Sequence, residues 1–413
     1  MNPEHKESFM TEQPALKVKR LQDLKLSRKR VILRVDFNVP LDADGGVRDN
    51  SRIRESLPTI RLLIKEQARV VILSHLGRPK GKPDPRLTLK PAADELAKLL
   101  GLPIAFCEET IGPRAEKAAK ALKPGEALLL ENLRFNPGEE EDSASFASAL
   151  SKLGDVFVQD AFGSLHRAHA STDALPRRMP SAVGLLVQKE IEFLDRALGN
   201  PQRPFLSIIG GAKVSSKLGV LKRLVERVDS LLIGGGMAYT FLHAQGVSVG
   251  RSLVEKEMLD EAKSIIEKAY ARQITCLLPA DHAAVKELRP ESPVEMTQGM
   301  AIPPDMIGVD IGPNTVDIFS EQIKKAKTIF WNGPLGVFEM EPFAKGSLAI
   351  AKVVAKQGGK TDVVTIAGGG DTLALVAKAG VADSFSHLST GGGASLEFVE
   401  GKILPGLKAL TGS

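Results

Sequence analysis

Basic side chains follow several apolar segments in the first half of the chain, close to the points where those segments end. They are His75 and four arginines, Arg52, Arg78, Arg134 and Arg167. The planar guanidinium of arginine pairs through two hydrogen bonds with a phosphate or a carboxylate. Any one of these arginines alone is more often a surface residue or the partner of a nearby acid. Together, at the carboxyl ends of parallel strands, the five side chains predict a basic pocket that binds an anion.

Two polar residues and two further histidines lie in the same loops. Asp36 and Asn38 are predicted to bind hydroxyl groups or to orient the guanidinium groups. His75 is predicted to donate a hydrogen bond to the anion. His166 and His169 have a spacing that metal ligands use on a helix, but no cysteine or acid completes a zinc set. The alternative for His169 is a structural histidine.

Glycine clusters punctuate the second half of the chain, and most of them follow directly on an apolar run. They are Gly210-Gly211, Gly234-Gly235-Gly236, Gly333 with Gly336, and Gly368-Gly369-Gly370. Glycine after a buried strand lets the backbone approach a ligand closely. A helix that follows adds free N–H groups and a dipole that favour an anion. Several such loops predict a phosphate-rich ligand at the carboxyl ends of parallel strands.

The last cluster opens a predicted helix that continues through residues 373–378. Asp371, directly after these glycines, is a candidate magnesium ligand beside phosphates held by backbone N–H groups. The alternative for Asp371 is an N-cap, and the two roles are compatible.

Other polar residues of the second half are candidates for the same site. Lys213 and Lys217 are four residues apart and share one face if the segment after Gly211 is helical. They would then face a transferring phosphoryl group, and solvated lysines are the alternative. Glu339 is a candidate acceptor for ribose hydroxyls, whereas Trp331 is equally a core residue.

Three common nucleotide signatures are absent from the sequence. There is no GxxxxGKS or GxxxxGKT segment, which excludes a P-loop enzyme. The VAIK, HRD and DFG set of protein kinases is also missing. No GxGxxG is followed by an acid about 20 residues on, which argues against a dinucleotide site.

Short apolar segments alternate with amphipathic ones, which indicates parallel sheets covered by helices on both faces. The predicted strands are 31–37, 69–74, 127–131, 155–159, 204–209, 230–233, 274–278, 328–331, 362–367 and 386–388. The pattern runs twice in 413 residues, so we predict two doubly wound, Rossmann-like α/β domains. Residues 186–198 are predicted to form the helix that joins residues 17–186 to residues 187–400, and residues 1–16 a disordered extension.

The composition is that of an ordinary globular protein, with 43% hydrophobic and 25% charged residues. A formal net charge of +5 is mild for this length, and no block of Lys and Arg supports binding to nucleic acid. Cys107 and Cys276 form no metal or disulfide pattern, which favours a reducing compartment, the cytoplasm. We expect no signal peptide and, without an apolar run of about 18 residues, no membrane span.

A series of segments in a fixed order carries a resemblance to a known family. They are RVDFNVP (34–40), SHLGRP (74–79), ENLRF (131–135), DAFG (160–163), HRAH (166–169), GGAKV (210–214), GGGMA (234–238), WNGPLGVFE (331–339), GGGDT (368–372) and STGGGASLE (389–397). Through them the chain resembles phosphoglycerate kinases from about residue 21 to its end. The resemblance implies a monomeric, hinge-bending enzyme of glycolysis, in which residues 401–413 pack back on the first domain. Its reaction is reversible phosphoryl transfer between 1,3-bisphosphoglycerate and ADP, giving 3-phosphoglycerate and Mg-ATP.

The resemblance also implies a set of site residues. For 3-phosphoglycerate they are Asp36, Phe37, Asn38, Arg52, His75, Leu76, Gly77, Arg78, Arg134 and Arg167. For the nucleotide they are Gly211, Lys213, Lys217, Gly234, Gly235, Asn332, Pro334, Glu339, Gly368, Gly369, Gly370, Asp371 and Thr372, with Asp371 next to Mg²⁺. Those implied to act in catalysis are Arg52, Lys213, Lys217 and Gly369. The chain departs from the family pattern at Ser216, where AKVxDK often has an acid.

The implied mechanism agrees with these residue types. A substrate carboxylate is already a nucleophile, so catalysis depends on in-line positioning and on cations around the transferring group. Arg52 and Lys213 are expected to meet on the phosphoryl group when the domains close and exclude water. One alternative is an NAD-dependent dehydrogenase, and another is a non-enzymatic protein that binds anions or nucleic acid. Neither explains both sets of residues.

Overall fold

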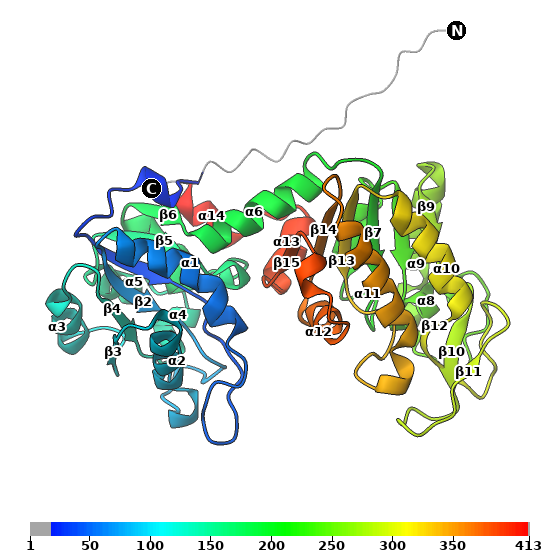
Figure 1. Cartoon of the computed structure of the whole chain (residues 1–413), viewed down its shortest axis with the longest axis horizontal. Coiled ribbons are helices and arrows are strands. Elements are labelled where there is room, and N and C mark those ends of the chain that lie inside the picture. Colours follow the sequence, from blue (N-terminus) through cyan, green and yellow to red (C-terminus); the bar gives the residue numbers. More distant parts are fainter. Residues whose placement is uncertain (1–17, 412–413) are drawn as a thin grey trace, which may run out of the picture. The chain divides into compact units, whose positions relative to one another are not determined.

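The computed structural model describes residues 18–411, and the predicted extension 1–16 lies outside them. The chain divides into two compact units. Unit 1 extends to Gln188 and takes in the segment that begins at Ile403, and unit 2 is Lys189–Lys402. Each unit has its own six-stranded parallel sheet with helices packed on it (Figure 1). The prediction of two parallel-sheet α/β folds is therefore confirmed.

The sheet of unit 1 has the strand order β3-β4-β2-β1-β5-β6. Its strands are β1 (Arg30–Arg34), β2 (Arg69–Leu73), β3 (Ile104–Cys107), β4 (Ala127–Leu130), β5 (Val156–Gln159) and β6 (Ser181–Val183). The central strands carry apolar runs that are buried on both faces, such as residues 31–33 and 70–73. Such runs are typical of parallel sheets between two layers of helices.

The helices of unit 1 connect these strands and cover the sheet. They are α1 (Ser51–Lys65), α2 (Lys90–Leu100), α3 (Pro113–Ala121), α4 (Pro137–Glu140), α5 (Ala144–Ser151) and α14 (Pro405–Leu410), with a π-helical turn at Ala170–Ala174. The C-terminal helix α14 packs on the π-helical turn. Leu407 and Leu410 are buried, and the Gly406 N–H donates to Leu165 O at 3.0 Å. A segment from the far end of the chain thus completes the core of unit 1.

The predicted helix at residues 186–198 is α6 (Leu185–Leu198), and it spans the division between the units. Asp160, directly after β5, caps its first turn: Oδ1 accepts the N–H groups of Leu186 and Val187 at 2.9 and 3.3 Å. Burial raises the pKa of Asp160 to about 7. Across residues 18–411, no helix combines the length and the apolar surface needed to cross a membrane.

The main sheet of unit 2 has the strand order β9-β8-β7-β13-β14-β15. Its strands are β7 (Phe205–Ile209), β8 (Ser230–Ile233), β9 (Thr275–Leu277), β13 (Thr328–Asn332), β14 (Val364–Gly368) and β15 (His387–Ser389). Counted along the chain, this is the 3-2-1-4-5-6 order of nucleotide-binding α/β folds. The chain leaves β7 and β13 toward opposite edges of the sheet. Their carboxyl ends therefore flank the topological switch point, where such sheets bind ligands.

Helices cover both faces of this sheet, as the buried strands require. They are α7 (Leu218–Leu224), α8 (Gly236–Ala244), α9 (Leu259–Ala271), α10 (Pro313–Lys325), α11 (Lys345–Gly358), α12 (Gly370–Lys378) and α13 (Gly393–Val399). Helices α10, α11 and α12 pack in a row (Figure 1). Helix α8 packs on α9, and α7 packs on α13. A small antiparallel sheet of β10 (His282–Val285), β11 (Glu295–Met296) and β12 (Ile307–Ile311) is inserted before α10.

Candidate active site

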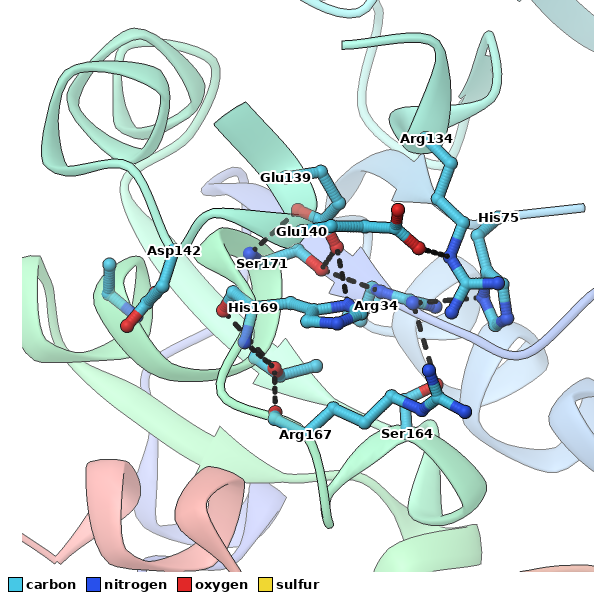
Figure 2. A network of polar contacts seen from close by, with 12 residues as sticks. Arg34, His75, Arg134, Glu139, Glu140, Asp142, Ser164, Arg167, His169 and Ser171 are labelled. Atoms are coloured by element: carbon cyan, nitrogen blue, oxygen red, sulfur yellow. Dashed lines mark hydrogen bonds and ion pairs between the residues drawn. The ribbon is translucent and has the colours of Figure 1, made fainter. Parts of the chain in front are cut away.

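Arg34, at the end of β1, is the centre of a polar network in unit 1 (Figure 2). Its side chain is buried. Nε donates to Ser171 Oγ at 2.9 Å, Nη1 donates to Val35 O, and Nη2 lies 3.0 Å from His75 Nδ1. A guanidinium has only donors, so His75 Nδ1 must accept and the ring proton of the neutral histidine is on Nε2. Arg34 thus fixes both the orientation and the tautomer of His75.

His75 is buried at the end of β2 and is neutral at pH 7. Burial lowers the pKa of His75 well below its usual value; Asp36 raises it to a smaller extent, and Arg34 and Arg134 lower it again. A neutral imidazole with its proton on Nε2 is a hydrogen-bond donor among arginines. With its proton on Nε2, His75 can donate the predicted hydrogen bond to an anion.

Arg52 lies in the first turn of α1 and pairs with Asp36, which follows β1. The Arg52 side chain is 36% exposed, so part of its guanidinium is free to bind a ligand, whereas Asp36 is 13% exposed. Asn38 Oδ1 accepts the Gly77 N–H at 2.9 Å. Asp36 therefore orients the Arg52 guanidinium, and Asn38 connects the loops that follow β1 and β2.

Arg134 and Arg167 come to this region from two other loops. Arg78 lies in the same loop as His75, but its side chain points to solvent. Arg134 Nη1 donates to Gly77 O at 2.7 Å. Arg167 Nε donates to His166 Nε2 at 3.3 Å. Arg78 is exposed, and the described part of the chain gives its side chain no hydrogen bond or ion pair. Of the five predicted basic side chains, Arg52 and Arg134 thus pair with the acids Asp36 and Glu140, His75 contacts Arg34, and Arg167 contacts its neighbour His166.

Phe37 and Leu76 are core residues of unit 1. They are 0% and 3% exposed. The Phe37 N–H donates to Ser74 Oγ at 2.8 Å, and the Leu76 N–H donates to Asn132 Oδ1 at 3.2 Å. Their part in the site is to fix the backbone of the loops that carry the polar residues.

Glu139, in α4, is a member of the network that the sequence pattern did not indicate. It is fully buried, and its two carboxylate oxygens accept the N–H and the Oγ–H of Ser171 at 3.0 and 2.6 Å (Figure 2). Burial raises the pKa of Glu139, and Arg34 lowers it. In the sequence Glu139 belongs to the acidic run 139–142, which is typical of a solvated surface. Nothing in that run distinguishes a buried carboxylate from its exposed neighbours.

In unit 2, the glycine loops after β7, β8 and β13 pack on one another. The Gly211 N–H donates to Pro334 O and the Gly235 N–H donates to Leu335 O, both at 2.9 Å. A Cβ on Gly210 would lie 2.1 Å from Pro334 O, and one on Gly235 would lie 2.8 Å from the backbone of Gly211. Glycine is required at these two positions because neighbouring loops approach each other so closely.

The loop after β14 is connected to the loop after β13 but remains open on one side. Asn332 Nδ2 donates to Gly368 O at 2.8 Å, and the Gly333 N–H donates to Thr372 Oγ1 at 2.7 Å. A Cβ on Gly370 would meet no atom within 4 Å. The start of α12 is therefore positioned by polar contacts and has free space beside it.

Lys217 lies among these loops, with Nζ donating to Asn332 O at 3.0 Å and to Asn332 Oδ1. Burial lowers the pKa of Lys217 to about 8, against the raising effect of Asp371. The cation is thus held against the loop after β13, at the switch point of the sheet. Positive charge at this place suits bound phosphates.

The prediction that Lys213 and Lys217 share one face of a helix is wrong. Residues 212–217 form irregular turns, and α7 begins directly after Lys217, which is its N-cap. Lys213 is exposed, whereas Lys217 is half-buried. Polar contacts hold this segment instead: Ser216 Oγ donates to Lys213 O at 2.8 Å, and buried Glu255 accepts the N–H and Oγ–H of Ser215 at 3.1 and 2.5 Å.

Asp371 lies in the first turn of α12, as predicted, but it is not the N-cap. That position belongs to Gly369, whose φ of +92° suits glycine. Asp371 and Glu339 are both exposed. Trp331 is a core residue: it is fully buried and its Nε1 donates to Gly333 O at 2.8 Å.

We expect Gly210→Ala to destabilise the protein and Gly370→Ala to leave its stability nearly unchanged. The first Cβ would press on a backbone carbonyl that cannot rotate away, and such overpacking typically costs about 1–3 kcal/mol. The second Cβ would enter open space. Denaturant unfolding of both variants gives the comparison. Equal free energies of unfolding for the two variants would contradict the close packing of the loops.

Comparison with known proteins gives a consistent result. A family model described as phosphoglycerate kinase matches residues 21–402. Phosphoglycerate kinase from Koribacter versatilis is 52% identical over 399 residues, which cover 95% of this chain and 98% of the relative. Phosphoglycerate kinase from Moorella thermoacetica is 52% identical over 391 residues, with 95% and 98% covered. The solved structure of phosphoglycerate kinase from Coxiella burnetii superposes with a TM-score of 0.86 at 43% identity and covers 95% of this chain and 99% of its own.

Fold and comparisons together define a two-domain α/β phosphotransferase whose acceptor is a carboxyl group. The chain belongs to the phosphoglycerate kinase family. Its reaction is the reversible transfer of a phosphoryl group between 1,3-bisphosphoglycerate and ADP, a step of glycolysis. The dehydrogenase alternative has no support.

Proposed function

We propose that the basic network of unit 1 is the site for 3-phosphoglycerate. His75, Arg134 and Arg167, with Arg78, hold the non-reacting phosphate, and Arg52 faces the reacting carboxylate. Asp36 and Asn38 orient these groups and bind the substrate hydroxyl. The observation that carries the proposal is the neutral, buried His75, whose Nδ1 is occupied by Arg34 and whose proton is therefore left on Nε2.

We further propose that the nucleotide binds at the switch point of unit 2. The first turn of α12 and the loops after β7 and β13 meet there. Free N–H groups at a helix N-terminus suit phosphates, and glycine leaves room for them at Gly370. Lys213 and Lys217 supply positive charge, and Glu339 accepts from ribose hydroxyls.

Magnesium fits this site through Asp371. A single exposed carboxylate in the first turn of α12, beside the proposed phosphates, matches the way proteins bind Mg²⁺ with one or two carboxylates plus substrate oxygens. When bound, the ion neutralises charge on the nucleotide phosphates. The residues of the chain then orient the nucleotide, and Lys217 supplies a further cation.

The mechanism that follows needs no general base, because the carboxylate of 3-phosphoglycerate is itself the nucleophile. Arg52, Lys213 and Lys217 stabilise the charge that develops on the transferring phosphoryl group. His75 and the other arginines of unit 1 fix the substrate in line for attack. We also propose that the enzyme is a monomer and acts in the cytoplasm. The free cysteines Cys107 and Cys276 support the reducing compartment.

We expect Asp371→Asn to weaken binding of Mg-ADP by about tenfold or more, while binding of 3-phosphoglycerate stays within twofold of wild type. A hard cation prefers a carboxylate to a neutral amide. Isothermal titration calorimetry with each ligand separately gives both values. Asp383→Asn, an exposed acid outside the glycine loops, is the control and should bind both ligands normally. Equal losses for both ligands in Asp371→Asn would contradict the assignment.

The proposed sites are tested together in an assay that couples 3-phosphoglycerate and Mg-ATP to an auxiliary dehydrogenase. His75→Gln should raise the KM for 3-phosphoglycerate by about tenfold or more and leave the KM for ATP within twofold. A normal KM for 3-phosphoglycerate in this variant would place the substrate elsewhere.

A further inference from the structure

A line of buried polar side chains in unit 1 leads from Glu139 to His75 through Ser171 and Arg34 (Figure 2). Glu139 and Ser171 are fully buried, Arg34 is 1% exposed and His75 is 5% exposed. The links measure 2.6 Å from Ser171 Oγ to the carboxylate, 2.9 Å from Arg34 Nε to Ser171 Oγ, and 3.0 Å from Arg34 Nη2 to His75 Nδ1. Four residues from four different segments are thus connected without exposure to solvent.

With Glu139 ionised, each hydrogen bond in this line has a single direction. An ionised Glu139 only accepts, so both the N–H and the O–H of Ser171 donate to it. The hydroxyl proton of Ser171 is then engaged in the hydrogen bond to Glu139, and a lone pair of the same oxygen accepts from Arg34 Nε. Arg34 has no acceptor, so it donates to His75 Nδ1 and leaves the ring proton on Nε2. The tautomer and orientation of His75 therefore depend on the Glu139 carboxylate, to which His75 is connected through three successive hydrogen bonds.

The Arg34 guanidinium is held from several sides and therefore has little freedom to bind substrate itself. Nη1 donates to Val35 O, and Nη2 also lies 3.5 Å from Ser164 Oγ, a weak contact. Removing the acceptor of Nε would leave a buried, charged donor unsatisfied and allow the guanidinium to rotate. Rotation would break the bond to His75 Nδ1.

We propose that Glu139 and Ser171 are positioning residues of the 3-phosphoglycerate site, which act through Arg34 to keep His75 oriented as an Nε2–H donor. This inference rests on the proposed function of unit 1. A hydrogen bond to a charged group typically changes an equilibrium by about tenfold or more. We expect loss of these hydrogen bonds to weaken binding of 3-phosphoglycerate and to leave binding of the nucleotide unchanged.

The first test is Ser171→Ala, which removes the hydroxyl and no charge. We expect the Kd for 3-phosphoglycerate, measured by calorimetry, to rise by about tenfold and the Kd for ADP to stay within twofold. ¹⁵N NMR of the His75 ring should show loss of the single Nε2–H tautomer. Ser164→Ala is the matched control, because it removes a hydroxyl from the same guanidinium at only 3.5 Å. Its Kd should stay within about twofold of wild type.

The second test, Glu139→Gln, separates positioning from charge. If Glu139 were only a buried counter-charge to Arg34 and Arg134, its removal would make the pocket more positive and 3-phosphoglycerate would bind more tightly. The positioning role predicts the reverse, because a glutamine amide has a single acceptor oxygen for the two Ser171 donors, so one of the two hydrogen bonds is lost and an NH₂ group faces a donor. Tighter binding in Glu139→Gln, or unchanged binding and an unchanged His75 tautomer in Ser171→Ala, would overturn the inference.

The variant His75→Gln distinguishes this outcome from failure of the proposed site. Weak binding of 3-phosphoglycerate in His75→Gln with normal binding in Ser171→Ala would refute only the positioning role. Normal binding in His75→Gln would refute the site, and with it the basis of the inference.

Discussion

Arg52→Ala is expected to lower kcat by roughly 10²–10³ and to change the KM for 3-phosphoglycerate much less. This is the magnitude of losing one preorganised electrostatic group that acts on the transition state. Arg52 is positioned for this role because α1 begins beside it and Asp36 orients its guanidinium, which is still 36% exposed. Steady-state kinetics in both directions, with circular dichroism to confirm folding, gives the two parameters.

Arg54→Ala is a matched control for this prediction. Arg54 lies on the same helix and is exposed, and its side chain donates to Asn50 Oδ1 at 2.8 Å, so its removal should leave kcat within about twofold. Arg134→Ala should behave differently from both and raise KM, because Arg134 contributes to binding of the ground state. A near-normal kcat in Arg52→Ala would show that the reacting carboxylate does not lie at Arg52.

The second large effect is expected at Lys217, both in rate and in pH dependence. Lys217→Met should lower kcat by roughly 10²–10³ because it removes a cation from the phosphoryl group. Burial lowers the pKa of Lys217 to about 8, so the free enzyme loses this charge as the pH rises through that value. We therefore expect kcat/KM for ADP to fall above about pH 8. Bound phosphate stabilises the charged form, so the corresponding fall in kcat should occur at higher pH.

Lys217→Arg tests whether titration of Lys217 causes the alkaline fall in kcat/KM, because arginine keeps its charge throughout this pH range. In that variant the fall in kcat/KM near pH 8 should disappear, even if the activity is lower overall. Lys222→Ala, which removes an exposed lysine paired with Glu261 at 2.8 Å, should leave the profile unchanged. An alkaline fall that persists in Lys217→Arg would assign the titration to another group.

The sequence predicts ten of the described strands, among them all six of the main sheet of unit 2, and misses β3, β6 and β10 to β12. β7 and β8 consist of buried residues on both faces, so composition alone marks them. β3 is an edge strand in which Ala105 is exposed, and β6 has only three residues. Strands β10 to β12 belong to an antiparallel insertion. β10 and β12 are almost entirely buried, but His282, Gly308 and Asp310 interrupt their apolar runs, and β11 has only two exposed residues.

The candidate site is predictable to the extent that each residue stands next to a strand end. His75 lies two residues after β2 and Arg134 four residues after β4, so the topology brings their loops to one edge of the sheet. The geometry of Lys213 is not predictable in this way, because glycines and serines around it allow both a helix and irregular turns. Glu139 is missed for a different reason. Its buried carboxylate pairs with Ser171, which is distant in the sequence, and the local sequence pattern contains no sign of that contact.

The packing of α14 has a consequence for how the protein is made. The segment from Ile403 leaves the ribosome only after all of unit 2, and at about 5–20 residues per second this takes roughly 10–40 s from Gln188. During that interval the nascent chain of unit 1 exposes the apolar surface that Leu407 and Leu410 later cover, next to the π-helical turn that carries Ser171. The domain translated first is therefore the one completed last.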